Sequence, residues 1–210
     1  MDRLFTYIEE CCKKYDIDES HGLKHSRDTV EWAKLLIAAE TTHVSTEEER
    51  MILYCAALHD MCDVKYRDPK AASDEIRIWL VNTEKWSTET ATALVNIIMT
   101  MSYSKLKARM LNGKPDYPDH GPWQRAYHIA RHADLLEGYK VRRCMLYTKH
   151  RLPQETSAAY WPIVREVFEN RVLNYVSDGW IFLPKAIELS VALHNRAVLD
   201  LQYENEEENS

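Results

Sequence analysis

The chain has 210 residues, 45% of them hydrophobic and 29% charged, with a formal net charge of −6. A chain of this size fits one domain of ordinary size or at most two small ones, with a core large enough to fold without disulfides or a structural metal. Its apolar runs are far shorter than the ~20 residues that cross a bilayer, its first residues lack a signal peptide's apolar core, and its acidic balance disfavours binding to duplex nucleic acid.

Apolar residues recur at helical spacing along most of the chain. Only five glycines occur, where average composition would give about 15, and tight hairpins and phosphate-binding loops both depend on glycine. We therefore predict an all-α fold, a single bundle of about eight to ten helices. The predicted helices are 2–15, 21–42, 47–61, 69–82, 87–102, 104–112, 122–138, 139–149, 156–176 and 184–203.

Polar residues mark where several of these helices begin and end. Ser20 is predicted to cap the helix that begins at 21, and Ser45 the helix that carries three glutamates in its first turn. Residues 113–122 hold three prolines and two glycines, which predicts a surface loop near a cleft. Residues 204–210 are acidic and polar, so we expect one domain over 1–203 and a disordered tail.

The cysteines indicate a reducing compartment. They are odd in number and lack CxxC spacing, at positions 11, 12, 55, 62 and 144, which does not suit a disulfide framework. We therefore expect reduced thiols in a cytoplasmic protein. The short apolar runs and the acidic balance described above predict no membrane partner and no duplex nucleic-acid partner.

Four ionisable residues lie on apolar helix faces. The apolar stripe of helix 47–61 ends in His59 and Asp60, Asp134 shares a face with alanines of helix 122–138, and His25 aligns with apolar residues of its own helix. A lone histidine there is more often a hydrogen-bonded core residue than a ligand. Burying an ionised carboxylate, however, costs several kcal/mol unless it is paired or metal-bound. One shared divalent ion, such as Mn, Mg, Co, Ni, Fe or Zn, would satisfy all four.

Three segments carry a family resemblance: Ser-His-Gly-Leu-Lys-His at 20–25, Ala-Leu-His-Asp-Met-Cys-Asp-Val-Lys at 57–65, and Ala-Asp-Leu-Leu at 133–136. Over about residues 18–140 the chain resembles the HD-domain metal-dependent phosphohydrolases, in particular small ones with SHGxxH and LHDxxDxK motifs. The resemblance implies that His25, His59, Asp60 and Asp134 are the metal ligands, and that residues 1–203 form an HD domain.

The same resemblance suggests roles for neighbouring residues. Asp63 follows His59 by four positions, so helical geometry would return it to the same face, where it could orient a water or accept its proton. The alternative is a solvated carboxylate that pairs with Lys65. Lys65 and Arg27 are candidates for binding phosphate oxygens, as are, more weakly, Lys105, Arg131, Arg142 and Arg143. His21 is a candidate for orienting the substrate or the first ligand, or else a surface residue.

These residues predict a metal-dependent phosphohydrolase that acts on a small phosphoester, a nucleotide or a related phosphate metabolite. One alternative is a phosphodiesterase or a two-metal oxygenase, because His120, His128 and His132 lie between the His-Asp pair and Asp134. Another is a regulatory module that keeps the metal site without turnover. The identity of the metal, the substrate and the oligomeric state stay open at this point.

Overall fold

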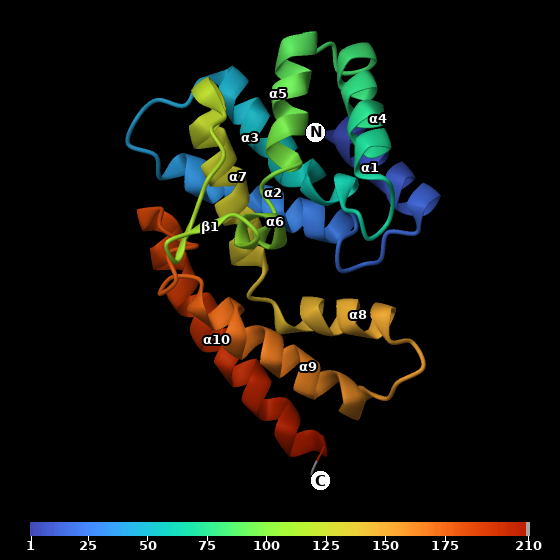
Figure 1. Cartoon of the computed structure of the whole chain (residues 1–210), viewed down its shortest axis with the longest axis vertical. Helices are drawn as coiled ribbons and strands as arrows, with labels where there is room; N and C mark the ends of the chain where they lie inside the picture. Colours follow the sequence, from blue (N-terminus) through green and yellow to red (C-terminus); the bar gives the residue numbers. More distant parts are fainter. Residues whose placement is uncertain (209–210) are drawn as a thin grey trace.

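The computed structural model describes residues 1–208, and the side chains of all of these except 157 and 203–208. Within that part the chain forms ten α-helices, three short 3-10 helices and one two-stranded sheet (Figure 1), which confirms the predicted all-α fold. The α-helices are α1 (Asp2–Tyr15), α2 (Leu23–Ala38), α3 (Thr46–Leu58), α4 (Pro69–Asn82), α5 (Thr88–Ile98), α6 (Tyr103–Lys107), α7 (Gln124–Glu137), α8 (Val141–Arg151), α9 (Ser157–Asn170) and α10 (Pro184–Glu208).

Helices α2, α3 and α7 pack against one another at the centre of the molecule. Alanines at the contacts, such as Ala33, Ala56 and Ala130, are fully buried, and their small side chains let the helix backbones approach closely. Helix α1 packs on α2, and α5 packs on both α3 and α4. The three central helices are thereby packed from several sides, and α2, α7 and the turn that follows α3 contribute to the site described below.

Helices α8, α9 and α10 form a second layer beside this core (Figure 1). Helix α8 packs on α9, and α10 contacts both α7 and α8. The chain enters the layer at Gly138, where a Cβ atom would lie 3.0 Å from the carbonyl oxygen of Leu135. Gly138 itself keeps helical angles (φ −60°, ψ −20°), and the backbone turns out of α7 at Lys140, which is extended (φ −73°, ψ 102°).

The predicted helix starts are confirmed at Ser45 and wrong at Ser20. The Ser45 hydroxyl accepts a hydrogen bond from the Glu48 N–H, as an N-cap does. Helix α2 instead begins after Gly22, without a side-chain cap, because the Ser20 hydroxyl lies 2.7 Å from Nδ1 of His21 and hydrogen-bonds to that ring.

The predicted helix 47–61 ends early, at Leu58, and His59–Cys62 form a 3-10 turn, η1. The ring of His59 supplies a physical reason. Its Nδ1–H donates to the carbonyl oxygen of Ala56 at 2.8 Å, and an uninterrupted α-helix would offer that oxygen to the N–H of Asp60. At Asp63 the backbone is already extended, with φ −73° and ψ 129°.

The predicted helix 104–112 is also shorter, because an unpredicted hairpin follows it. Strands β1 (Met110–Leu111) and β2 (Lys114–Pro115) pair antiparallel. The two residues between them, Asn112 and Gly113, have φ of 50° and 77°, the left-handed conformation that a type I′ turn needs. Asn-Gly is the pair best suited to that turn. The low glycine content, which disfavoured tight hairpins, therefore did not exclude one here.

The chain ends in α10, which runs to Glu208. Residues 209–210 and the side chains from 203 onward lie outside the described residues, so the domain boundary at 203 and the disordered tail stay predictions. All five cysteines are free. Among the helices in residues 1–208, none has the length and hydrophobicity that a transmembrane span requires.

His132 attaches the start of α10 to the core. The ring is fully buried, and its Nδ1–H donates to the carbonyl oxygen of His128 at 2.6 Å. Nε2 then accepts from the backbone N–H groups of Phe182 and Leu183, at 3.0 and 3.3 Å. Burial, together with the neighbouring Arg131 guanidinium, lowers the pKa of His132 well below its usual value, which keeps the ring neutral and Nε2 free to accept.

We expect His132→Leu to destabilise the protein by roughly 1–3 kcal/mol, because it leaves two partly buried backbone N–H groups without their acceptor. His132→Gln retains an acceptor at similar reach and should cost less. Urea unfolding followed by circular dichroism measures both free energies. Equal losses for the two variants would show that the acceptor at Nε2 is unimportant.

Candidate metal centre

Two imidazoles and two carboxylates meet where α2, η1 and α7 converge. Nε2 of His25 lies 3.0 Å from Nε2 of His59, and both nitrogens lie 3.2 Å from Oδ2 of Asp60. Oδ1 of Asp134 lies 3.6 Å from Nε2 of His25 and 3.3 Å from Nε2 of His59. The structure thus brings together all four side chains that the sequence indicates as ligands.

The chemistry of this cluster suits a cation. Because Nδ1 of His59 carries the proton donated to Ala56, Nε2 of a neutral ring presents a lone pair to the centre. Oδ2 of Asp60 is buried without a hydrogen-bond partner among the described residues. A buried carboxylate oxygen facing imidazole nitrogens at this distance calls for positive charge between them. His25, His59 and Asp60 lie close enough together to hold one metal ion.

The electrostatics of the cluster favour ionised carboxylates. Burial raises the pKa of Asp60, but His59 and other positive neighbours outweigh it, so the pKa is well below its usual value. The same balance holds for Asp134. For His59, burial works against protonation, and the two carboxylates overcome it and raise the pKa well above the usual value. A cation at the centre would replace the proton on Nε2, because a ligating imidazole is neutral. Mixed nitrogen and oxygen donors of this kind suit divalent Mn, Fe, Co, Ni or Zn better than Mg.

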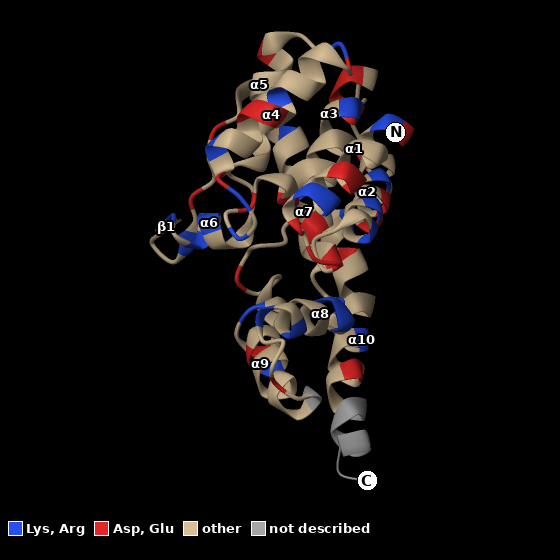
Figure 2. Cartoon of the chain, turned by 90° about the vertical axis from the view of Figure 1, so that its right-hand side faces the viewer, with Lys and Arg blue, Asp and Glu red and all other residues tan. Residues whose placement is uncertain are grey.

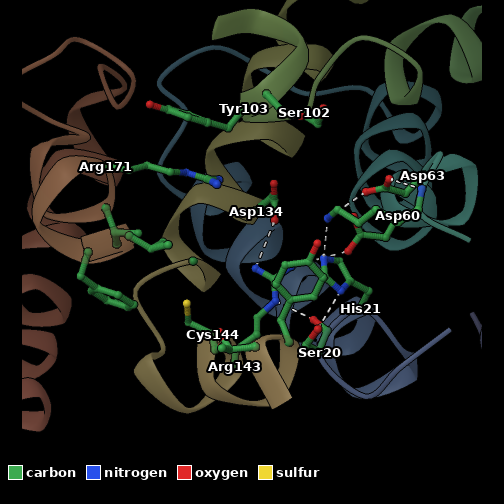
Figure 3. Close-up of a pocket in the computed structure, with 18 of the residues that line it drawn as sticks. Ser20, His21, Asp60, Asp63, Ser102, Tyr103, Asp134, Arg143, Cys144 and Arg171 are labelled. Carbon is green, nitrogen blue, oxygen red and sulfur yellow. Dashed lines mark hydrogen bonds and ion pairs between the residues drawn. The ribbon is translucent and has the colours of Figure 1, made fainter. Parts of the chain in front are cut away.

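Arg143, from α8, covers the two carboxylates from the side of the second layer (Figure 3). Its Nε–H donates to the carbonyl oxygen of Ser20 at 2.6 Å. The other two guanidinium nitrogens lie 3.6 Å from Oδ2 of Asp60 and 3.9 Å from Oδ1 of Asp134. Of the four weaker phosphate-binding candidates in the sequence, Arg143 alone reaches the site within the described residues.

Asp63 lies beside the cluster, but the backbone conformation that places it there is not the predicted helix. It lies beyond the 3-10 turn on extended backbone, so helical periodicity does not place it there. Its carboxylate nevertheless lies within 4.8 Å of ligand atoms of His21 and Asp60. Oδ1 accepts from the backbone N–H of Lys65 at 3.0 Å, and Oδ2 lies 3.2 Å from Nζ of Lys65. The predicted pairing with Lys65 therefore coexists with a position beside the cluster.

His21 is buried, so it is not the surface histidine that the sequence left open. Nδ1 lies 2.7 Å from the Ser20 hydroxyl and 2.9 Å from the hydroxyl of Tyr66, which in turn donates to Asp18. Nε2 accepts from Nζ of Lys65 at 3.3 Å. Burial lowers the pKa of His21. The ring therefore holds the ammonium group of Lys65 at the edge of the cluster.

A cavity of about 520 Å³ opens beside the cluster. Asp60, Asp63 and Asp134 line it, together with His21, Lys65 and Arg143 (Figure 3). Basic residues also gather on α8, which carries four arginines and lysines and no acidic residue (Figure 2). The site is therefore accessible to a ligand, and its carboxylates face a wall with excess positive charge.

Arg27 is the predicted site residue that the structure does not bring to the cavity. It is exposed on α2, and its guanidinium lies 5.0 Å from the ring centre of Phe5. Arg171, which sequence reasoning missed, does line the cavity, with its guanidinium 4.0 Å from the ring centre of Tyr103. It follows α9, and no motif marks it, because its position depends on how the second layer packs.

The further histidines do not extend the cluster. Nε2 of His120 lies 3.0 Å from the hydroxyl of Thr100, and Nε2 of His128 lies 3.0 Å from the amide nitrogen of Gln124. Both ring nitrogens of His132 are engaged, as described above. In the part of the chain that the structure describes, none of the three belongs to a group able to hold a metal. These contacts favour a site for one ion.

Comparison with protein-family models, with curated proteins and with solved structures found no match. The assignment of this site therefore depends on the residues and their geometry.

We expect a divalent ion to stabilise the protein through this cluster. An ion present at 100 times its dissociation constant adds about 2.7 kcal/mol to the free energy of unfolding. Asp60→Asn should abolish the rise in melting temperature on adding Mn²⁺, because it removes a buried anionic donor, whereas Asp63→Asn should retain most of it. Differential scanning fluorimetry with and without the ion measures this. An equal loss in both variants would argue for the neighbouring group of His21, Asp60 and Asp63 instead.

Proposed function

We propose that the chain is a metal-dependent phosphohydrolase of the HD superfamily that cleaves a small phosphoester. The observation that carries the proposal is the meeting of His25, His59, Asp60 and Asp134 in one cluster whose two carboxylates, Asp60 and Asp134, line an open cavity. The resemblance to HD hydrolases supports it independently, because the motifs belong to the sequence and do not depend on the geometry.

The four residues are assigned to hold one divalent ion. When bound, such an ion polarises a phosphoryl oxygen and lowers the pKa of a coordinated water. The chemistry of the four side chains suits this role, since they offer two imidazole nitrogens, two carboxylates and an open side toward the cavity.

Asp63 is assigned to orient the attacking water and to accept its proton. Its carboxylate lies on the cavity wall beside Asp60, and its side chain is 20% exposed, so solvent can reach it. The backbone N–H of Lys65 holds Oδ1, which fixes the direction of the group. An oriented base of this kind contributes about 10²–10⁴ in rate.

Lys65 and Arg143 are assigned to bind the phosphate oxygens. Lys65 is held by His21 and Asp63, and Arg143 by the carbonyl of Ser20. His21 acts on the substrate through Lys65, whose ammonium group it positions. Two cations can thus neutralise charge on the phosphate while the carboxylates serve the ion.

Turnover of a panel of phosphomonoesters and phosphodiesters by Mn²⁺-loaded protein tests the proposal. Asp60→Ala should abolish phosphate release, and Asp63→Asn should lower kcat about 10²–10⁴-fold with the ion still bound. Asp74→Ala, at a half-exposed position on α4 outside the cavity wall, is the matched control. If the metal-loaded protein hydrolyses no ester in the panel, the non-catalytic regulatory module replaces the hydrolase. Elemental analysis that finds two ions per chain would favour the two-metal alternative.

Lys65→Ala should lower kcat/KM for phosphomonoesters at least about tenfold, because a hydrogen bond to a charged group is worth roughly 1.5–3 kcal/mol. The exposed Lys70 of α4 provides the control, since Lys70→Ala removes the same charge outside the cavity. Steady-state kinetics at low and high salt separates the local contact from general attraction. Equal losses in both variants would assign the effect to net charge alone.

A further inference from the structure

The part of the cavity away from Asp60 and Asp63 has a different chemistry from the metal end. Its wall comes from α9, from the end of α7 and from the segments that flank α9. The apolar side chains there are Leu135, Leu152, Ile163, Val167, Phe168 and Val172. Figure 3 shows Tyr103 and Arg171 on the opposite side of Asp134 from Asp60 and Asp63. The cavity therefore joins a polar compartment to an apolar one.

The apolar compartment exposes aliphatic surface to whatever enters. Ile163 is 37% exposed although it lines the cavity, while its neighbour Phe168 on α9 is fully buried. A ligand that covers Ile163 gains free energy from the apolar area removed from water.

Several polar side chains line the cavity, and most of them already have partners. The ring of Tyr147 contacts His21 and Lys65, and the guanidinium of Arg151 lies 5.9 Å from the centre of that ring. The hydroxyls of Ser102 and Ser104 lie 3.4 Å apart. Within the described residues the cavity wall contains no Asn, Gln or Glu, and its three aspartates all lie at the metal end. The hydroxyl of Thr148 already donates to the carbonyl of Cys144. A nucleobase carries several donors and acceptors along its edges, and burying them here without partners would cost binding free energy. The lining favours a ligand part without hydrogen-bonding groups.

Arg171 supplies an anion-binding group at the boundary of the two compartments. Its guanidinium stacks on the ring of Tyr103, and its Nε–H donates to the Tyr175 hydroxyl at 2.9 Å. Within the described part of the chain no carboxylate forms an ion pair with it. Arg143 lies on the same cavity wall, held by the carbonyl of Ser20. A negatively charged head group fits between these two cations.

We propose that the ligand is a phosphomonoester of an aliphatic alcohol, with its phosphate at the metal end and its hydrocarbon chain in the apolar compartment between α8 and α9. The inference rests on the proposed function only in placing the phosphate. A volume of about 520 Å³ accommodates such a molecule, since ligand pockets commonly measure about 300–1,000 Å³. This narrows the small phosphoester to a lipid-like one in place of the nucleotide that the sequence suggested.

Binding of n-alkylphosphonates tests the inference without any turnover, because their carbon–phosphorus bond is not an ester. Isothermal titration calorimetry with Mn²⁺-loaded protein compares the methyl, butyl, hexyl and octyl compounds. Affinity should rise about two- to fourfold for each added methylene until the compartment is filled. Octylphosphonate should also bind more tightly than deoxyadenosine monophosphate.

Matched variants test where the hydrocarbon chain of the ligand binds. Ile163→Asn should remove most of the dependence on chain length and leave methylphosphonate binding unchanged. Ile187→Asn is the control, because Ile187 is also 37% exposed but lies on α10 outside the cavity wall. If Ile163→Asn does not fold, the nearly isosteric Val167→Thr answers the same question. Arg171→Gln should weaken every member of the series by a similar factor.

The outcomes separate this inference from the hydrolase proposal. If the affinity for alkylphosphonates rises with the length of the alkyl chain but the protein cleaves no phosphoester, the apolar binding site is supported and the hydrolase proposal is overturned. If the protein cleaves phosphoesters but its affinity for alkylphosphonates does not depend on the length of the alkyl chain, the hydrolase proposal is supported and the apolar binding site is overturned. Tighter binding of the nucleotide than of octylphosphonate would also overturn the inference.

Discussion

The burial of two carboxylates against two imidazoles is the constraint on which the rest of the structure depends. Asp60 and Asp134 lie on the wall of the cavity with ionised side chains, and the charge must be balanced. The molecule meets this demand by crossing α2, η1 and α7 at one point, which in turn requires close packing. The buried alanines of the central helices follow from that requirement, because larger side chains would separate the ligands.

Separate groups around the cluster hold the two cations, Lys65 and Arg143, in position. His21, Tyr66 and Asp18 form a partly buried hydrogen-bonded chain that holds Lys65, and the carbonyl oxygen of Ser20 holds Arg143. Neither cation relies on the carboxylates alone for its position. Both remain on the cavity wall, where they can bind an anion without giving up the contacts that place them.

The sequence was most informative where chemistry is unusual. An aspartate on an apolar helix face is costly, so Asp60 and Asp134 stand out, and apolar periodicity indicates where most of the helices lie. Local competition was harder to foresee: the ring of His59 captures a backbone oxygen and ends α3 early, and Asn112-Gly113 forms a hairpin in a glycine-poor chain. The place of Arg171 in the cavity wall could not be predicted from the sequence, because it depends on contacts between the two layers. Arg27 was predicted to reach the site because it is close to His25 along the chain, but the structure does not place it in the cavity wall.

The two-layer arrangement has a consequence for how such a protein can diverge. The proposed ligands come from α2, η1 and α7, whereas most of the apolar wall and the cations Arg143 and Arg171 come from α8, α9 and the segments that follow them. Substitutions in the outer layer can therefore reshape the choice of ligand while the reactive centre keeps its geometry. Selectivity and reactivity are encoded in separable stretches of the chain, so mutation can explore one without sacrificing the other.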